Sequence, residues 1–93
     1  MMEFKDDDKR IYVVNEAGQE MGQMIYENHD DHNRIHVTHT FTNKEFQGQG
    51  LAGKLLDQMV KKAEKENKKI TTTCSYVERK FDQESEKYQH VMG

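Results

Sequence analysis

The sequence predicts a small α/β domain on a mixed sheet: an antiparallel β-meander, then a β-α-β unit with two parallel strands, then a C-terminal helix. Three observations lead to this class. Strand-like runs of β-branched and aromatic residues fill the first half, an amphipathic helical pattern follows a glycine-rich stretch, and a short strand pattern comes after that helix. A helical crossover makes the last two strands parallel, and it should be right-handed.

The first two strands form a predicted hairpin. Residues 11–14 are a β-branched and aromatic run, residues 16–19 (EAGQ) are the turn, and a second strand covers residues 20–26. The stretch before the hairpin contains KDDDK and is highly charged. We expect residues 1–9 to be a solvated leader and residues 10–93 to form one domain.

The third strand follows the polar connection ENHDDHN. Ile35, Val37, His39 and Phe41 alternate with polar residues there, which is the period of a strand. One side of this strand is therefore predicted to be apolar except for His39.

From Gly50 onward the apolar spacing becomes helical, and a helix is predicted to run to about Asn67. Its apolar positions are Leu51, Ala52, Leu55, Leu56, Met59, Val60 and Ala63. Residues 70–74 then form the fourth predicted strand. The side chains expected on one side of it and its extension are Ile70, Thr72, Cys74 and Tyr76. A last helical pattern covers residues 77–91.

Length and composition exclude multi-domain and membrane-spanning proteins. With 93 residues and a net charge of −3 the chain is one small domain, and no apolar run is long enough to cross a membrane. We expect neither a nucleic acid nor a membrane among its partners. Cys74, the only cysteine, cannot form an internal disulfide, which suits a reducing cytoplasm.

The stretch EFQGQGLAGKLL resembles several phosphate-binding loops. Gly48, Gly50 and Gly53 fit the dinucleotide pattern, but no acidic residue follows at the distance needed to hold a ribose. The same stretch has Leu55 where a P-loop needs Ser or Thr for Mg²⁺. What remains is a helix N-terminus with unpaired N–H groups that favours a pyrophosphate, or glycines that only shape a loop.

The charge distribution agrees with an anionic ligand at this stretch. Residues 44–69 carry seven basic and four acidic groups, whereas residues 1–43 carry four and nine. A solvated helix face and its exit turn are the favoured explanation for five of these residues, Lys61, Lys62, Lys65, Lys68 and Lys69.

The sequence as a whole resembles the very small GNAT-like N-acetyltransferases. The similarity covers residues 10–92 and rests on THTFTNKEFQGQGLAGKLLDQMV, ITTTCSY and SEKYQHVM, with Gln47, Gly50 and Ala52 in the family's acyl-CoA signature. This resemblance implies a truncated GNAT fold, a splayed parallel strand pair and acetyl-CoA as cosubstrate. It also implies a primary amine, on a small molecule or a protein, as acceptor.

The resemblance also implies which residues bind the coenzyme. The residues expected at the pyrophosphate are Gln47, Gly48, Gln49, Gly50, Leu51, Ala52 and Gly53. The end of the third strand, Phe41, Thr42 and Asn43, is expected to pair with the pantetheine arm. The family often has Arg where this chain has the neutral Gln47. A hairpin replaces two helices that shape the acceptor site in larger members, so the acceptor is not predicted. We expect the protein to be a monomer or a homodimer.

Three residues are candidates for catalysis. His39 is a base or a structural histidine, and Cys74 accepts the acetyl group, protonates the leaving thiolate, or simply packs in the core. Tyr76 is an acid or an anchor for the sheet edge. Direct transfer to the amine is the first mechanism considered, and an acetyl-Cys74 intermediate is the second.

No metal site is expected. The histidines at positions 29, 32, 36 and 39 lie near Asp30 and Asp31, but the strand directs His36 and His39 to opposite sides. Two functions without catalysis also fit the sequence: a module that binds acetyl-CoA without turnover, and an interaction domain with a vestigial loop.

Overall fold

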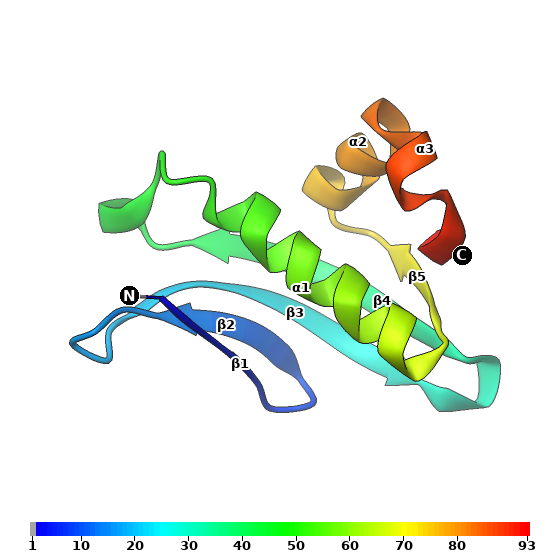
Figure 1. The fold of residues 1–93 in the computed structure, drawn as a ribbon, viewed down its shortest axis with the longest axis horizontal. Helices are drawn as coiled ribbons and strands as arrows, with labels where there is room; N and C mark the ends of the chain where they lie inside the picture. The colour runs from blue at the N-terminus through cyan, green and yellow to red at the C-terminus, as the bar shows by residue number, and fades with distance from the viewer. Residues whose placement is uncertain (1) are drawn as a thin grey trace.

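The structure, a computed structural model, describes residues 2–93 as a five-stranded mixed sheet with one long helix across one face (Figure 1). The strands follow one another in the sheet in chain order. The strands are β1 (Glu3–Asp6), β2 (Arg10–Val14), β3 (Glu20–His29), β4 (Arg34–Thr42) and β5 (Lys69–Thr72). The helices are α1 (Leu51–Glu66), α2 (Ser75–Gln83) and α3 (Ser85–Tyr88), with 3-10 turns η1 (Asp30–His32), η2 (Lys44–Phe46) and η3 (Gln89–Val91).

The predicted topology is confirmed. β2, β3 and β4 form an antiparallel meander, and β4 and β5 are parallel on either side of the α1 crossover. The polar connection is shorter than predicted, because β3 runs on to His29 and only η1 and Asn33 separate it from β4. Asn33 takes the left-handed conformation, with φ of 55°, that a tight turn requires and asparagine tolerates.

The stretch predicted to be a solvated leader contains a strand instead. β1 pairs antiparallel with β2, from Glu3 opposite Val14 to Asp6 opposite Ile11. Asp6 is tied to the rest of the molecule, since its carboxylate binds the Lys62 ammonium at 2.8 Å and accepts a hydrogen bond from the Tyr26 hydroxyl. The high charge of this stretch hid the strand from the sequence analysis, and most of its side chains are exposed. Met1 lies outside the described residues.

A β-bulge in β4 changes the predicted alternation. Tyr26 pairs with Val37 but the preceding Ile25 pairs with His39, so Thr38 is an extra residue in β4. Ile35 and Val37, before the bulge, are fully buried, whereas His39 and Phe41 after it are exposed. The prediction that all four share one side was wrong, because a bulge reverses the facing of every later residue in the strand.

Helix α1 supplies five of the eighteen buried core residues in the described part of the chain. Its buried residues are Leu51, Leu55, Leu56, Met59 and Ala63. They pack with buried strand residues such as Val13, Met24 and Ile70 in one cluster. The helix ends at Glu66, close to the predicted end, and Asn67 caps it with φ of 59°. The Lys68 N–H closes the end by bonding to the Ala63 carbonyl at 2.8 Å.

The C-terminal helical stretch is broken into three short pieces. Val77, Phe81, Tyr88 and Val91 are buried as their spacing predicted, and the rings of Phe81 and Tyr88 lie 5.1 Å apart. The chain then returns to the sheet edge, where the Gly93 N–H bonds to the Ile70 carbonyl. No helix in the described part of the chain is both long and apolar enough to cross a membrane.

Candidate acyl-CoA site

The glycine stretch forms the turn that starts helix α1. Gly50 is the residue before the helix and has φ of 70°, and Gly48 has φ of 87°. A Cβ at either position would meet nothing within 4 Å, so crowding does not select glycine there. The left-handed backbone does, because L side chains are strained in that conformation.

The backbone N–H groups of this turn have no partner in the described part of the chain. The first N–H of α1 with an acceptor is that of Lys54, which bonds to the Gly50 carbonyl at 3.1 Å. Among residues 2–93, no group accepts a hydrogen bond from the N–H of any residue between Gly48 and Gly53. The first turn of α1 contains no acidic side chain, and Gln47 to Gly50 are exposed. Free N–H groups at the positive end of a 16-residue helix favour an anion.

Strands β4 and β5 stop pairing halfway along β4. The last bond between their backbones runs from the Thr73 N–H to the Val37 carbonyl at 3.1 Å, and the Thr72 hydroxyl bonds to the same carbonyl at 2.9 Å. β4 continues to Thr42, and no described strand pairs with that part of it on the β5 side. The strand pair is therefore open next to the start of α1.

In the open part of β4, only alternate residues point their backbone N–H and C=O groups toward the opening on the β5 side. The Asn43 N–H bonds to the Met21 carbonyl of β3 at 2.8 Å, so it is not free. In antiparallel pairing the backbone direction alternates, and Thr42 and Thr40 therefore direct their N–H and C=O groups away from β3. Of the predicted pantetheine contacts, Thr42 has this orientation. Thr40 was not predicted, because the bulge that precedes it is not visible in the sequence.

Cys74 lies across the opening. Its thiol donates a hydrogen bond to the Thr40 hydroxyl at 3.3 Å, and its N–H bonds to the Thr72 hydroxyl at 2.9 Å. The residue is 8% exposed. β5 ends before Cys74, which forms the N-terminal cap position of α2 rather than the predicted end of the strand.

Tyr76 places its hydroxyl close to Gly53 in the first turn of α1. Instead of continuing the strand, it lies in the first turn of α2, and its hydroxyl is 3.6 Å from the place a Cβ on Gly53 would occupy. Burial raises the pKa of the Tyr76 phenol above its ordinary value. A tyrosine phenol is protonated at neutral pH, as a proton donor must be, and burial extends that protonated range upward.

His39 is not brought to the same place. It is exposed, and the strand directs its side chain to the side opposite Thr40. Residues 2–93 contain no cluster of His, Cys, Asp or Glu arranged to hold a metal ion. Two of the other histidines stack, with the rings of His29 and His36 5.7 Å apart, and His36 also bonds to the Thr71 hydroxyl at 2.7 Å.

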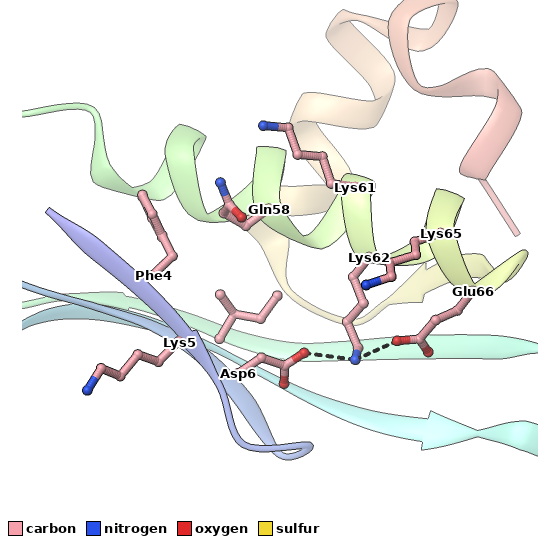
Figure 2. Close-up of a pocket in the computed structure, with 9 residues that line it drawn as sticks. Phe4, Lys5, Asp6, Gln58, Lys61, Lys62, Lys65 and Glu66 are labelled. Carbon is pink, nitrogen blue, oxygen red and sulfur yellow. Dashed lines mark hydrogen bonds and ion pairs between the residues drawn. The ribbon is translucent and has the colours of Figure 1, made fainter.

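A separate groove of about 280 Å³ lies between β1 and α1 (Figure 2). In it Lys62 bridges Asp6 and Glu66, each at 2.8 Å. Burial opposes the charge, but the bonds to both carboxylates hold the pKa of Lys62 above its ordinary value. Because Lys62 is already neutralised by two carboxylates, its role is to fasten β1 to the helix.

Comparison with known proteins identifies the family. The sequence model of the family described as GCN5-related N-acetyl-transferase matches residues 10–91. A GCN5-like protein of Staphylococcus aureus, a candidate N-acetyltransferase solved by NMR, is 28% identical with a TM-score of 0.76, over 98% of this chain and 87% of that one. No curated protein has a matching sequence.

Two larger proteins share the fold at low identity. N-acetylglutamate synthase from Neisseria gonorrhoeae, solved with coenzyme A and N-acetyl-glutamate, is 12% identical with a TM-score of 0.65, over 81% of this chain and 18% of that one. Tetrahymena GCN5 is 12% identical with a TM-score of 0.62, over 83% and 50%. The family match spans nearly the whole described domain and the folds agree, so the chain belongs to the GCN5-related N-acetyltransferase family.

Proposed function

We propose that the protein binds acetyl-CoA at the start of α1 and transfers its acetyl group to a primary amine. One observation carries this proposal: the N–H groups from Gly48 to Gly53 have no acceptor within residues 2–93, and they lie at the helix end nearest the open part of β4. The pyrophosphate of the coenzyme would accept these hydrogen bonds. The exposed Lys44 and Lys54 flank the turn and add positive charge that Gln47 does not provide.

The pantetheine arm would lie along the open part of β4. Its two amides suit the outward backbone groups of Thr40 and Thr42, in the way that an added strand pairs with a sheet edge. The thioester would then lie near Cys74 and Tyr76. An outward N–H group of the open part of β4 would stabilise the oxyanion that forms when the thioester carbonyl is attacked.

In direct transfer, the amine nitrogen attacks the thioester carbon, the C–N bond forms and the C–S bond breaks. A lysine amine with a pKa of ~10.4 is only about 0.04% deprotonated at pH 7, so removal of its proton contributes ~4.6 kcal/mol to the barrier. The amine proton passes to solvent, the departing thiolate takes a proton from the Tyr76 phenol, and solvent returns a proton to Tyr76. His39 faces the other side of the sheet, so we assign the base role to water rather than to this histidine.

The second route passes through Cys74. The Cys74 sulfur attacks the thioester carbon, and its proton goes to the departing coenzyme sulfur. The amine then attacks acetyl-Cys74, the C–S bond breaks, and the proton that the amine loses returns to the Cys74 sulfur. Burial of the thiol beside Thr40 positions it for this exchange but shields it from other reagents. In the reducing cytoplasm that the single cysteine suits, Cys74 would remain a free thiol.

Two measurements test the function. Calorimetry with acetyl-CoA measures binding, and release of free thiol in the presence of a panel of primary amines measures transfer. Binding together with amine-dependent thiol release is the expected result. Mass spectrometry after incubation without an amine then separates the routes, because a gain of one acetyl group on Cys74 is expected only for the covalent route. No binding at millimolar acetyl-CoA would contradict the proposal.

A module that binds acetyl-CoA without turnover is the second candidate. The observation favouring it is the short turn between β2 and β3, which leaves no helix on that connection to shape an acceptor pocket. Such a module would bind acetyl-CoA and release no thiol with any amine.

A further inference from the structure

Strand β1 is an edge strand with unpaired backbone groups. It lies at the end of the sheet opposite β5, and β2 is its only neighbour among the described strands. The Asp7 N–H bonds to the Arg10 carbonyl at 3.2 Å, which fixes which residues of β1 point their backbone toward β2. Because this direction alternates, Phe4 and Asp6 point their N–H and C=O groups toward the free edge.

The side chains of β1 also alternate. Phe4 packs partly buried against the core and lines the groove beside α1 (Figure 2). Glu3 and Lys5, on either side of it, are exposed and project to the other side of the strand. Within residues 2–93 neither Glu3 nor Lys5 forms an ion pair. The free edge thus carries an aromatic ring on one side of the strand, and one negative and one positive side chain on the other.

We propose that a second copy of the chain docks on this edge, with β1 antiparallel to β1 of the partner about a two-fold axis at Phe4. Antiparallel pairing requires outward-facing residues to stand opposite one another. With Phe4 opposite Phe4 of the partner, the outward groups meet and form reciprocal hydrogen bonds. The arrangement is symmetric, so it closes as a dimer and does not extend into a fibre.

The charges select this register over its neighbours. With Phe4 opposite itself, Glu3 stands opposite Lys5 of the partner, and the same pair occurs twice by symmetry. A shift of two residues one way would put Glu3 opposite Glu3 of the partner, and a shift the other way would put Lys5 opposite Lys5. Opposite charges directly across a strand pair stabilise it and like charges destabilise it. Lysine on an edge strand ordinarily prevents pairing, but here one register supplies its counter-charge.

The dimer would leave the proposed acyl-CoA site accessible. The two five-stranded sheets would join into one continuous sheet at their β1 edges, and β5 would lie at each outer end. Cys74 follows β5 and is therefore remote from the dimer contact. The proposal does not depend on acetyl transfer. The contact involves only four residues of each strand, so a weak dimer is expected.

Sedimentation equilibrium of the full chain, up to about 1 mM protein, tests the proposal. The wild-type chain is expected to show a concentration-dependent dimer that weakens at high salt. Glu3→Lys and Lys5→Glu should each weaken the dimer about tenfold or more, because each turns two attractive pairs into two repulsive ones. The double variant with both changes should regain wild-type dimerisation, and the two single variants should associate with each other when mixed.

Glu86→Lys is the matched control, since it makes the same change of charge at an exposed residue of α3. It should leave dimerisation unchanged, and circular dichroism should report the same fold for all variants. A wild-type chain that is monomeric at every concentration would overturn the proposal. So would a dimer that Glu3→Lys and Lys5→Glu weaken no more than Glu86→Lys does, because its interface would lie elsewhere.

Discussion

The thiol of Cys74 lies 3.3 Å from the hydroxyl oxygen of Thr40, joining the chain after β5 to the part of β4 that has lost its partner strand. This contact is the one side-chain bond that spans the opening among the described residues of the two strands. It holds Cys74 beside the proposed thioester position, where Cys74 acts either as a nucleophile or as a packing residue of the core. Substitutions at Cys74 distinguish these roles.

If transfer is direct, Cys74→Ala should keep turnover within about tenfold of the wild-type protein, as expected for loss of packing rather than of a nucleophile. Cys74→Ser should behave similarly and keep a hydroxyl able to bond to Thr40. Both variants should unfold with a free energy lowered by about 1 kcal/mol. Thiol-release kinetics and thermal unfolding check these values. Loss of turnover by several orders of magnitude in both variants, with the fold intact, would assign the covalent route instead.

Gly50→Ala should weaken acetyl-CoA binding as well as the fold. Its φ of 70° is strained for alanine, so the free energy of unfolding should fall by about 1–2 kcal/mol and the turn should shift. Gly18→Ala is the matched control, because Gly18 has φ of 80° and equally open space in the hairpin turn between β2 and β3. The control should lose similar stability and bind acetyl-CoA normally. Equal binding by both variants would separate the glycine turn from the coenzyme.

Tyr76→Phe should lower the turnover number with little effect on acetyl-CoA binding. Loss of a general acid reduces rates about 100-fold or more. Because burial raises the pKa of Tyr76, the wild-type phenol stays protonated past its ordinary value, and any loss of its contribution should occur only above that pH. Tyr12→Phe, on a strand remote from Cys74, is the control. A wild-type pH profile with no alkaline loss, together with full activity of Tyr76→Phe, would remove this role.

Asp6→Asn should destabilise the fold at neutral pH and make stability less sensitive to acid. Burial raises the pKa of Asp6, but the hydrogen bonds from Lys62 and Tyr26 outweigh burial, and the pKa lies below its ordinary value. A lowered pKa gives stability that is present above the unfolded-state value and is lost as pH falls through the folded-state value. The pair is partly exposed, so its loss should cost about 1 kcal/mol.

Urea unfolding between neutral and acidic pH checks the Asp6 prediction, with Asp82→Asn at an exposed position as the control. If the Asp6→Asn variant and the wild-type protein lose stability equally at low pH, other carboxylates cause the loss of stability in acid.

The sequence predicted the parts of the fold that depend on local pattern. The α1 helix, its end near Asn67 and the glycine turn each follow from residue spacing or from a conformation that few residues accept. The crossover between β4 and β5 follows from connection rules. The fold class was therefore predictable without the structure.

The remaining features depend on partners that are distant in the chain. The bulge at Thr38 arises from the register between β3 and β4, so alternation alone placed His39 on the wrong side. β1 is short and charged, and it is held by β2 and by Lys62, which follows it by more than fifty residues. Cys74 was expected to end a strand, but it begins a helix because β4 and β5 diverge before it.

Amide chemical shifts measured by NMR during titration with acetyl-CoA test the central claim most directly. If the coenzyme binds at the start of α1, the largest shifts should fall on residues from Gly48 to Gly53, with a second group at Thr40 and Thr42. Unchanged amides in the glycine turn, with the shifts gathered instead at the groove between β1 and α1, would contradict the account.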